Sequence, residues 1–128
     1  MAFQIQVCSL GSFIRVRESG LLDASRAKAL IRQVATASHI HRVDGILLDL
    51  RKTKINEADT TDLLGVASEF TLYLSGFRGR VANVVPGDPD RAGIASRLRD
   101  IIRLQSPAYE VFTSFEDAID WLLDVQPV

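Results

Sequence analysis

Chemically active side chains concentrate directly after one apolar run of the sequence, Ile46–Leu50. In an open α/β sheet, ligands bind beyond the carboxyl ends of the parallel strands, and this segment falls there if the apolar run is a strand. We therefore expect a partner or ligand to bind here. The polar residues of the segment are Asp49, Arg51, Lys52, Thr53, Lys54, Asn56, Glu57 and Asp59, and the candidate contacts are Asp49, Arg51, Thr53, Asp59 and Thr60.

The next four residues, Asp59-Thr60-Thr61-Asp62, fit two interpretations. Acids and hydroxyls at a helix start satisfy free backbone amides and favour the positive end of the helix dipole, so the group fits a helix cap. The alternative is a regulatory role, in which Thr60 or Thr61 accepts a phosphoryl group or the segment recognises a partner.

The segment Gly87–Gly93, GDPDRAG, joins a predicted strand to a predicted helix. It lacks the glycine order and the lysine of a phosphate-binding loop, and its acids would repel phosphate. We expect a structural turn in which Asp88 caps the helix and Pro89 takes the first helical position.

The rest of the sequence favours neither a metal site nor catalysis. His39 and His41 fall at the end of a predicted helix and lack the further ligands that zinc needs. There is no G-x-S-x-G elbow for a serine hydrolase. We expect no metal, no cofactor and no enzymatic activity. A reaction that uses Asp49, Asp59 or Asp88 is a minor alternative, because no base or nucleophile is placed beside these acids.

Apolar periodicity and turn signals predict the element order β-β-α-β-α-β-α-β-α. The first two strands form an antiparallel hairpin that Gly20 ends, Ile46–Leu50 is a central strand buried on both faces, and Arg51–Lys54 is a loop. The fold class is therefore α/β, a mixed and mostly parallel sheet covered by helices. The predicted strands are Phe3–Val7, Phe13–Arg17, Ile46–Leu50, Arg80–Val85 and Tyr109–Thr113, and the predicted helices are Asp23–His39, Ala58–Ser75, Asp88–Gln105 and Ser114–Leu123.

Length and charge narrow the class of protein. The 128 residues fit one domain, 1–128, and a net charge of −1 gives no electrostatic case for binding nucleic acid. The single cysteine, Cys8, excludes an internal disulfide. No apolar run approaches the roughly 18 residues of a membrane-spanning helix, so we expect a cytoplasmic protein.

The predicted helix Ala58–Ser75 has more apolar positions than one sheet face needs. Burial inside the monomer is the first interpretation. The alternatives are an apolar surface for a partner subunit and the wall of a hydrophobic ligand pocket. The stripe at helical spacing is Leu63, Val66, Ala67, Phe70 and Leu74, and the residues that widen it are Leu64, Leu72, Tyr73 and Phe77.

Three stretches, Gly45–Leu50, Gly79–Val85 and Val111–Leu122, resemble the SpoIIAA-like family, small bacterial proteins of the STAS and CRAL-TRIO-like superfamily. The most specific part is a Phe near the last strand followed by E-x-A-x-x-W-L, here Glu116–Leu122. The resemblance implies a four- or five-stranded mixed sheet with helices mainly on one side, and a non-enzymatic module that binds proteins.

In anti-sigma-factor antagonists of that superfamily, a Ser after the D-L strand is phosphorylated. The matching position here falls near Ala58, so the sequence lacks this Ser, and Thr60 and Thr61 are out of register.

The expected function is a non-catalytic STAS-like module that binds an unknown protein partner through the segment after Leu50 and through the second helix. Self-association as a homodimer is part of this expectation. The alternative is a small apolar or lipid-like ligand in a cleft lined by Leu64, Tyr73 and Phe77.

Overall fold

The computed structural model describes residues 4–8, 13–55, 62–74, 76–105 and 108–123. Their order along the chain is β-β-α-β-α-β-α-β-α, as the sequence predicts. The elements are β1 (Gln4–Cys8), β2 (Phe13–Leu21), α1 (Ala24–His41), β3 (Gly45–Lys54), α2 (Leu63–Leu74), β4 (Arg80–Val84), α3 (Pro89–Arg103), β5 (Tyr109–Phe112) and α4 (Phe115–Leu123).

The strands form one sheet in the order β1-β2-β3-β4-β5. β1 and β2 pair antiparallel, and each following neighbour pairs in parallel. The predicted hairpin and the predicted mixed sheet are thus confirmed. β3 is the middle strand, and residues 45–50 are all buried, because helices cover both faces at this position.

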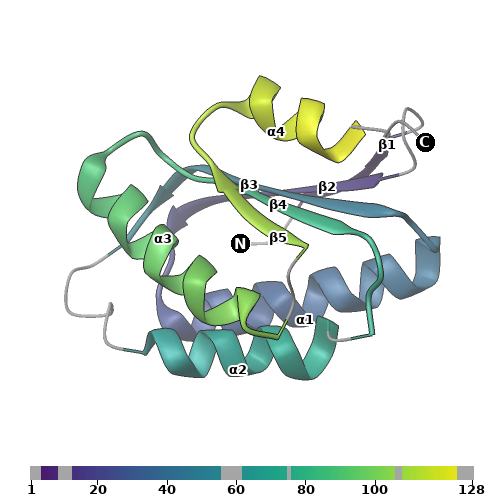
Figure 1. The fold of residues 1–128 in the computed structure, drawn as a ribbon, viewed down its shortest axis with the longest axis horizontal. Helices are drawn as coiled ribbons and strands as arrows, with labels where there is room; N and C mark the ends of the chain where they lie inside the picture. Colours follow the sequence, from purple (N-terminus) through teal and green to yellow (C-terminus); the bar gives the residue numbers. More distant parts are fainter. Residues whose placement is uncertain (1–3, 9–12, 56–61, 75, 106–107, 124–128) are drawn as a thin grey trace.

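The helices are divided unequally between the faces of the sheet (Figure 1). α1, α2 and α3 lie on one face, where they bury the larger core around Ile14, Ile46 and Ile102. α4 lies alone on the other face and packs on Leu47, Ala82 and other small or branched side chains. The prediction of helices mainly on one side is therefore confirmed.

The caps of three helices are those that the sequence predicts. Asp23 accepts a hydrogen bond from the backbone N–H of Arg26, 2.8 Å long, and Asp88 caps α3 with Pro89 in its first turn. Ser114 accepts from the N–H of Asp117 before α4. Each oxygen satisfies an amide that the helix leaves free.

Two predicted boundaries are wrong, and both for the same reason. Arg51–Lys54 was expected to be a loop, yet β3 continues to Lys54, and β2 passes Gly20 to end at Leu21. After a register shift between Arg17 and Ser19, the ends of the two strands pair again. Backbone pairing between distant segments thus keeps polar residues in strands that local patterns would end.

Candidate functional site

Asp49, the first predicted contact, is buried on the face of the sheet that carries α4. Its carboxylate accepts hydrogen bonds from Arg15 Nη2 at 2.9 Å and from Arg51 Nε and Nη2, each at 2.8 Å. Both guanidinium groups also lie 4.6 Å from the centre of the Phe115 ring. Asp49 is therefore the centre of a group of ionic and cation–π contacts that we call the Asp49 network. Its members are Asp49, Arg15, Arg51 and Phe115.

Burial alone would raise the pKa of the Asp49 carboxyl. The hydrogen bonds from Arg51 and Arg15 outweigh burial and lower this pKa from 3.8 to about 2. The carboxylate stays charged near neutral pH, and both of its oxygens are occupied by cations. This arrangement holds strands β2 and β3 and helix α4 together. Of the four residues, Arg51 is the exposed one.

Thr53 is buried at the carboxyl end of β3, where the sequence predicts a binding loop. Its hydroxyl donates to the carbonyl of Leu50 at 2.7 Å and accepts from Arg91 Nη2 at 2.8 Å. Arg91 Nη1 donates to the Thr53 carbonyl at 3.2 Å. The structure thus joins Thr53 to a cation of α3 that the sequence analysis assigned only to a turn.

Arg91 could have been found from its helical spacing. It shares one face of α3 with Ala95, Leu98 and Ile102, at the intervals of four, three and four residues that mark a buried stripe. A cation on the apolar stripe of a helix is unusual and signals a polar site inside the fold. The motif GDPDRAG instead indicates a turn in which Asp88 caps the helix.

Asp59, Thr60 and Thr61 lie outside the described residues, as does the predicted helix start at Ala58. Phosphorylation of Thr60 or Thr61 stays a prediction. The neighbouring Asp62 is described, and it pairs with Lys28 of α1 at 2.8 Å. The pair with Lys28 lowers the pKa of the Asp62 carboxyl, which also accepts from the N–H of Gly65.

The structure does not support the cleft predicted for an apolar ligand, because none of the pockets found among the described residues is lined by Leu64 together with Tyr73 and Phe77. Leu64 is 71% exposed on the first turn of α2, and Phe77 packs against the core beyond the end of the helix. Tyr73 and Phe77 border a groove near His39 and Arg42, from which Leu64 is absent.

Full burial of α2 inside the monomer is also wrong. Val66, Ala67, Phe70 and Leu74 are buried, whereas Leu72 is 68% exposed and Tyr73 46% exposed. The helix packs on α1 and α3, and Phe70 contacts Tyr109 of β5, whereas Leu64, Leu72 and Tyr73 stay exposed. The exposed apolar side chains therefore form a surface, which we call the outer face of α2: Leu64, Leu72 and Tyr73.

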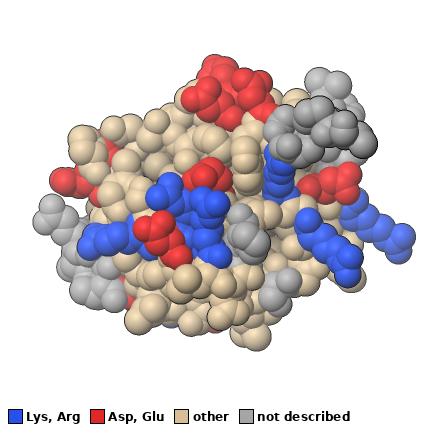
Figure 2. Space-filling model, in the orientation of Figure 1, with Lys and Arg blue, Asp and Glu red and all other residues tan. Residues whose placement is uncertain are grey.

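Charged side chains on the surface are mixed in sign over much of the view in Figure 2, where Lys and Arg gather over α3 beside acids. The ion pairs there include Arg99 and Arg103 with Glu110 of β5, at 3.3 and 3.1 Å. The acids of α4, by contrast, form a group of their own at the top of the view. Exposed pairs of this kind contribute little to stability.

Within the described part of the chain, no three His, Cys, Asp or Glu side chains are placed to hold a metal ion. Among those same residues, no helix has the length and apolar character to cross a membrane.

Comparison with protein-family models gives no match, and comparison with curated protein sequences gives none. Among solved structures, the chain is similar to the anti-sigma factor antagonist SpoIIAA in its unphosphorylated form, with a TM-score of 0.52 and 18% identity over 97% of this chain and 100% of that one. The chain has a SpoIIAA-like fold. A second structure with a SpoIIAA-like fold, a protein from Shewanella loihica, matches with a TM-score of 0.56 and 17% identity over 94% of this chain and 92% of that one.

The SpoIIAA-like fold explains the placement of the candidate residues. Asp49 and Thr53 lie on β3, the middle strand of the sheet; Asp49 binds Arg51, which lies against Phe115 of α4, and Thr53 binds Arg91 of α3, which covers the other face. Arg91 meets Thr53 beyond the carboxyl end of β4, at the edge where open α/β sheets bind ligands. At these identities the likeness concerns the fold, and function has to be argued from the residues.

Proposed function

We propose that the chain is a non-catalytic regulatory module that acts by binding proteins, and that it forms a homodimer through the outer face of α2. The observation that carries the proposal is the exposure of Leu64, Leu72 and Tyr73 on a helix whose inner side is fully used by the core. Large apolar side chains exposed on one helix are candidates for an interaction site on a soluble protein.

The outer face of α2 has the composition of an interface core with a polar rim. Leu64 and Leu72 are two helical turns apart, and Ser68 lies between them. Tyr73 adds an aromatic side chain, which interfaces favour. At its edge, Arg32 of α1 pairs with Glu69 at 3.1 Å and lies 6.0 Å from the centre of the Tyr73 ring.

The helix that presents this surface is held rigidly. Four buried side chains fix it to the sheet, and the pairs Lys28–Asp62 and Arg32–Glu69 tie it to α1. A rigid surface loses little conformational entropy when it binds, which favours association.

The class of function is supported by the neighbour with the same fold, which is named as an anti-sigma factor antagonist and so acts on another protein. The cytoplasm is the proposed compartment, since a chain with one cysteine uses no internal disulfide. Arg51, the exposed member of the Asp49 network, is a further proposed contact for a partner other than a second copy.

Light scattering after size-exclusion chromatography tests the dimer. The wild-type chain should have twice the monomer mass at micromolar concentration, and Leu72→Glu should have the monomer mass because a charge is placed in the apolar surface. Leu123→Glu, the same change on α4 across the sheet, should stay dimeric. A wild-type monomer at every concentration, or equal masses for the two variants, would contradict the proposal.

A further inference from the structure

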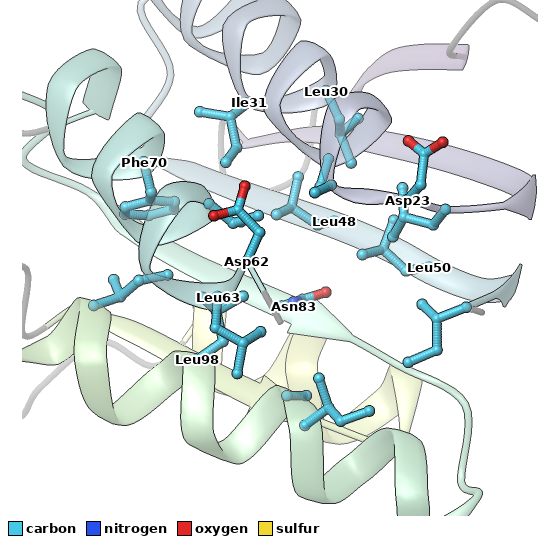
Figure 3. A pocket seen from close by; sticks show the side chains of 18 of the residues that line it. Asp23, Leu30, Ile31, Leu48, Leu50, Asp62, Leu63, Phe70, Asn83 and Leu98 are labelled. Atoms are coloured by element: carbon cyan, nitrogen blue, oxygen red, sulfur yellow. The ribbon is translucent and has the colours of Figure 1, made fainter. Parts of the chain in front are cut away.

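A pocket of about 120 Å³ lies between the sheet and helices α1, α2 and α3 (Figure 3). It is distinct from the outer face of α2, because it opens among the inner sides of the helices. Its walls are mainly apolar and include Leu30, Ile31, Leu48, Leu50, Phe70 and Leu98. An apolar cavity of about this size can hold one benzene molecule.

One wall of the pocket carries a buried amide with an unused acceptor. Asn83 of β4 is 5% exposed, and its Nδ2 donates to the Tyr109 hydroxyl at 2.9 Å. Its Oδ1 is buried with no hydrogen-bond partner. Figure 3 shows this side chain in the pocket between α2 and α3. A buried oxygen without a donor costs free energy, which only a ligand with a hydrogen-bond donor offsets, so this acceptor marks the pocket as polar here but does not itself favour a carboxylate.

Arg91 is a second polar residue among those that line the pocket, and its guanidinium binds Thr53, which borders a neighbouring groove that Arg91 also lines. Arg91 is 6% exposed, yet its hydrogen bonds go to two neutral oxygens, the carbonyl and hydroxyl of Thr53. No carboxylate among the described residues lies within ion-pair distance of it. Two of its five N–H donors are thus used, and its buried charge lacks a counter-ion.

Burial lowers the pKa of Arg91, and the more distant charge of Asp88 only partly offsets this. Two other carboxylates line the pocket, and both are engaged. Asp23 accepts from the N–H of Arg26, and Asp62 pairs with Lys28. Asp62 thus has a counter-ion, whereas Asp23 and Arg91 bind only uncharged groups, and of these two Arg91 is the buried one.

We propose that the pocket binds a small hydrophobic carboxylic acid, with its apolar part between the sheet and the helices and its carboxylate on Arg91. A planar guanidinium forms two parallel hydrogen bonds with a carboxylate, which makes arginine the best match for this anion. The apolar walls select against free inorganic anions, which would lose their hydration and gain no packing.

Titration of the ¹⁵N-labelled chain with benzoate, benzyl alcohol and benzylamine tests this proposal by NMR. The three probes share one ring and differ in charge. We expect benzoate to bind about tenfold more tightly than benzyl alcohol, as a hydrogen bond to a charged group predicts. Benzylamine should bind more weakly than either, and the side-chain amide signals of Asn83 should shift with benzoate.

Variants of α3 separate the role of Arg91 from general effects of charge. Arg91→Met should abolish the preference for benzoate over benzyl alcohol while the apolar pocket still binds both. Arg97→Met removes an exposed arginine of the same helix and should keep the preference. If Arg91→Met does not fold, Arg91→Lys should still prefer benzoate to benzylamine, because it retains a cation.

Several results would overturn the proposal. They are equal affinities for the three probes in the wild-type chain, a preference for benzoate that survives in Arg91→Met, and the absence of any saturable shift in residues that line the pocket. None of these outcomes bears on the oligomeric state, so the proposed dimer is tested separately.

Discussion

Arginines on the two faces of the sheet differ in their counter-ions and in burial: those beside α4 are partly exposed and bind a carboxylate, and the one on the opposite face is buried without one. On the α4 face, Arg15 and Arg51 share the carboxylate of Asp49 and lie against the ring of Phe115. On the opposite face, Arg91 meets only the neutral oxygens of Thr53. In the first arrangement the carboxylate has its counter-ions within the chain, although Arg15 Nε is buried without a hydrogen-bond partner; in the second, no anion of the described residues meets the guanidinium.

This difference separates charged side chains that stabilise the fold from one that can bind a ligand. A buried ion pair with complete hydrogen bonding needs nothing further, and its removal is costly because the remaining charges lose their partner. A buried cation without an anion already bears that cost in the folded chain. The sequence predicts binding at Asp49, whereas in the structure the buried charge without a counter-ion is that of Arg91, and the proposed ligand site follows from this difference.

The largest effect that we expect comes from Asp49→Asn. This change leaves Arg15 and Arg51 without their carboxylate and should lower the free energy of unfolding by about 3 kcal/mol, at the lower end for a broken buried pair because both arginines are partly exposed. Urea unfolding measures it. A loss below about 0.5 kcal/mol, the range of neutral surface changes, would remove the structural role of the network.

The acid dependence of stability should follow from the same carboxyl. Because its pKa falls from 3.8 to about 2 on folding, Asp49 stabilises the chain above pH 3.8, and this contribution is lost as the pH falls to about 2. The shift corresponds to about 2 kcal/mol. The difference in unfolding free energy between the wild-type chain and Asp49→Asn should therefore shrink over this range; a constant difference would exclude the depressed pKa.

A smaller effect is expected for Phe115→Ala, which removes the ring against which both guanidinium groups lie. Phe115 is half-buried, so the loss of packing and of the cation–π contacts should cost about 1.5 kcal/mol. Asp120→Ala, an exposed change on the same helix, is the control and should have little effect. Equal losses for the two variants would show that the ring does not support the arginines.

The smallest effect is expected for Arg91→Met in the absence of ligand. The variant loses two hydrogen bonds to Thr53 but also removes a buried charge without a counter-ion. We expect the free energy of unfolding to change by less than about 1 kcal/mol, or to rise. A loss of unfolding free energy as large as that of Asp49→Asn would show that Arg91 stabilises the fold as the Asp49 network does.

Local patterns predicted what depends on neighbours in the sequence. The caps Asp23 and Asp88, the buried core of β3 and the element order follow from short-range rules of capping and periodicity. The continuation of β3 to Lys54 does not, because it depends on a register shift in β2, more than thirty positions earlier in the chain.

The site was less predictable than the fold for the same physical reason. Asp49 is neutralised by Arg15, and Arg91 is bound by Thr53, through contacts between residues that are 34 and 38 positions apart. Whether a charge has a partner is decided by such contacts. The exposure of Leu72 likewise depends on which elements pack around α2, which helical periodicity does not specify.

The most direct test of the contrast between the two faces is the gain in unfolding free energy that benzoate produces in the wild-type chain, Asp49→Asn and Arg91→Met. A ligand that binds the folded state stabilises it in proportion to the logarithm of its concentration relative to its dissociation constant. We predict equal gains for the wild-type chain and Asp49→Asn, and a much smaller gain for Arg91→Met. An equal gain in all three proteins would contradict the assignment of Arg91 as the binding charge.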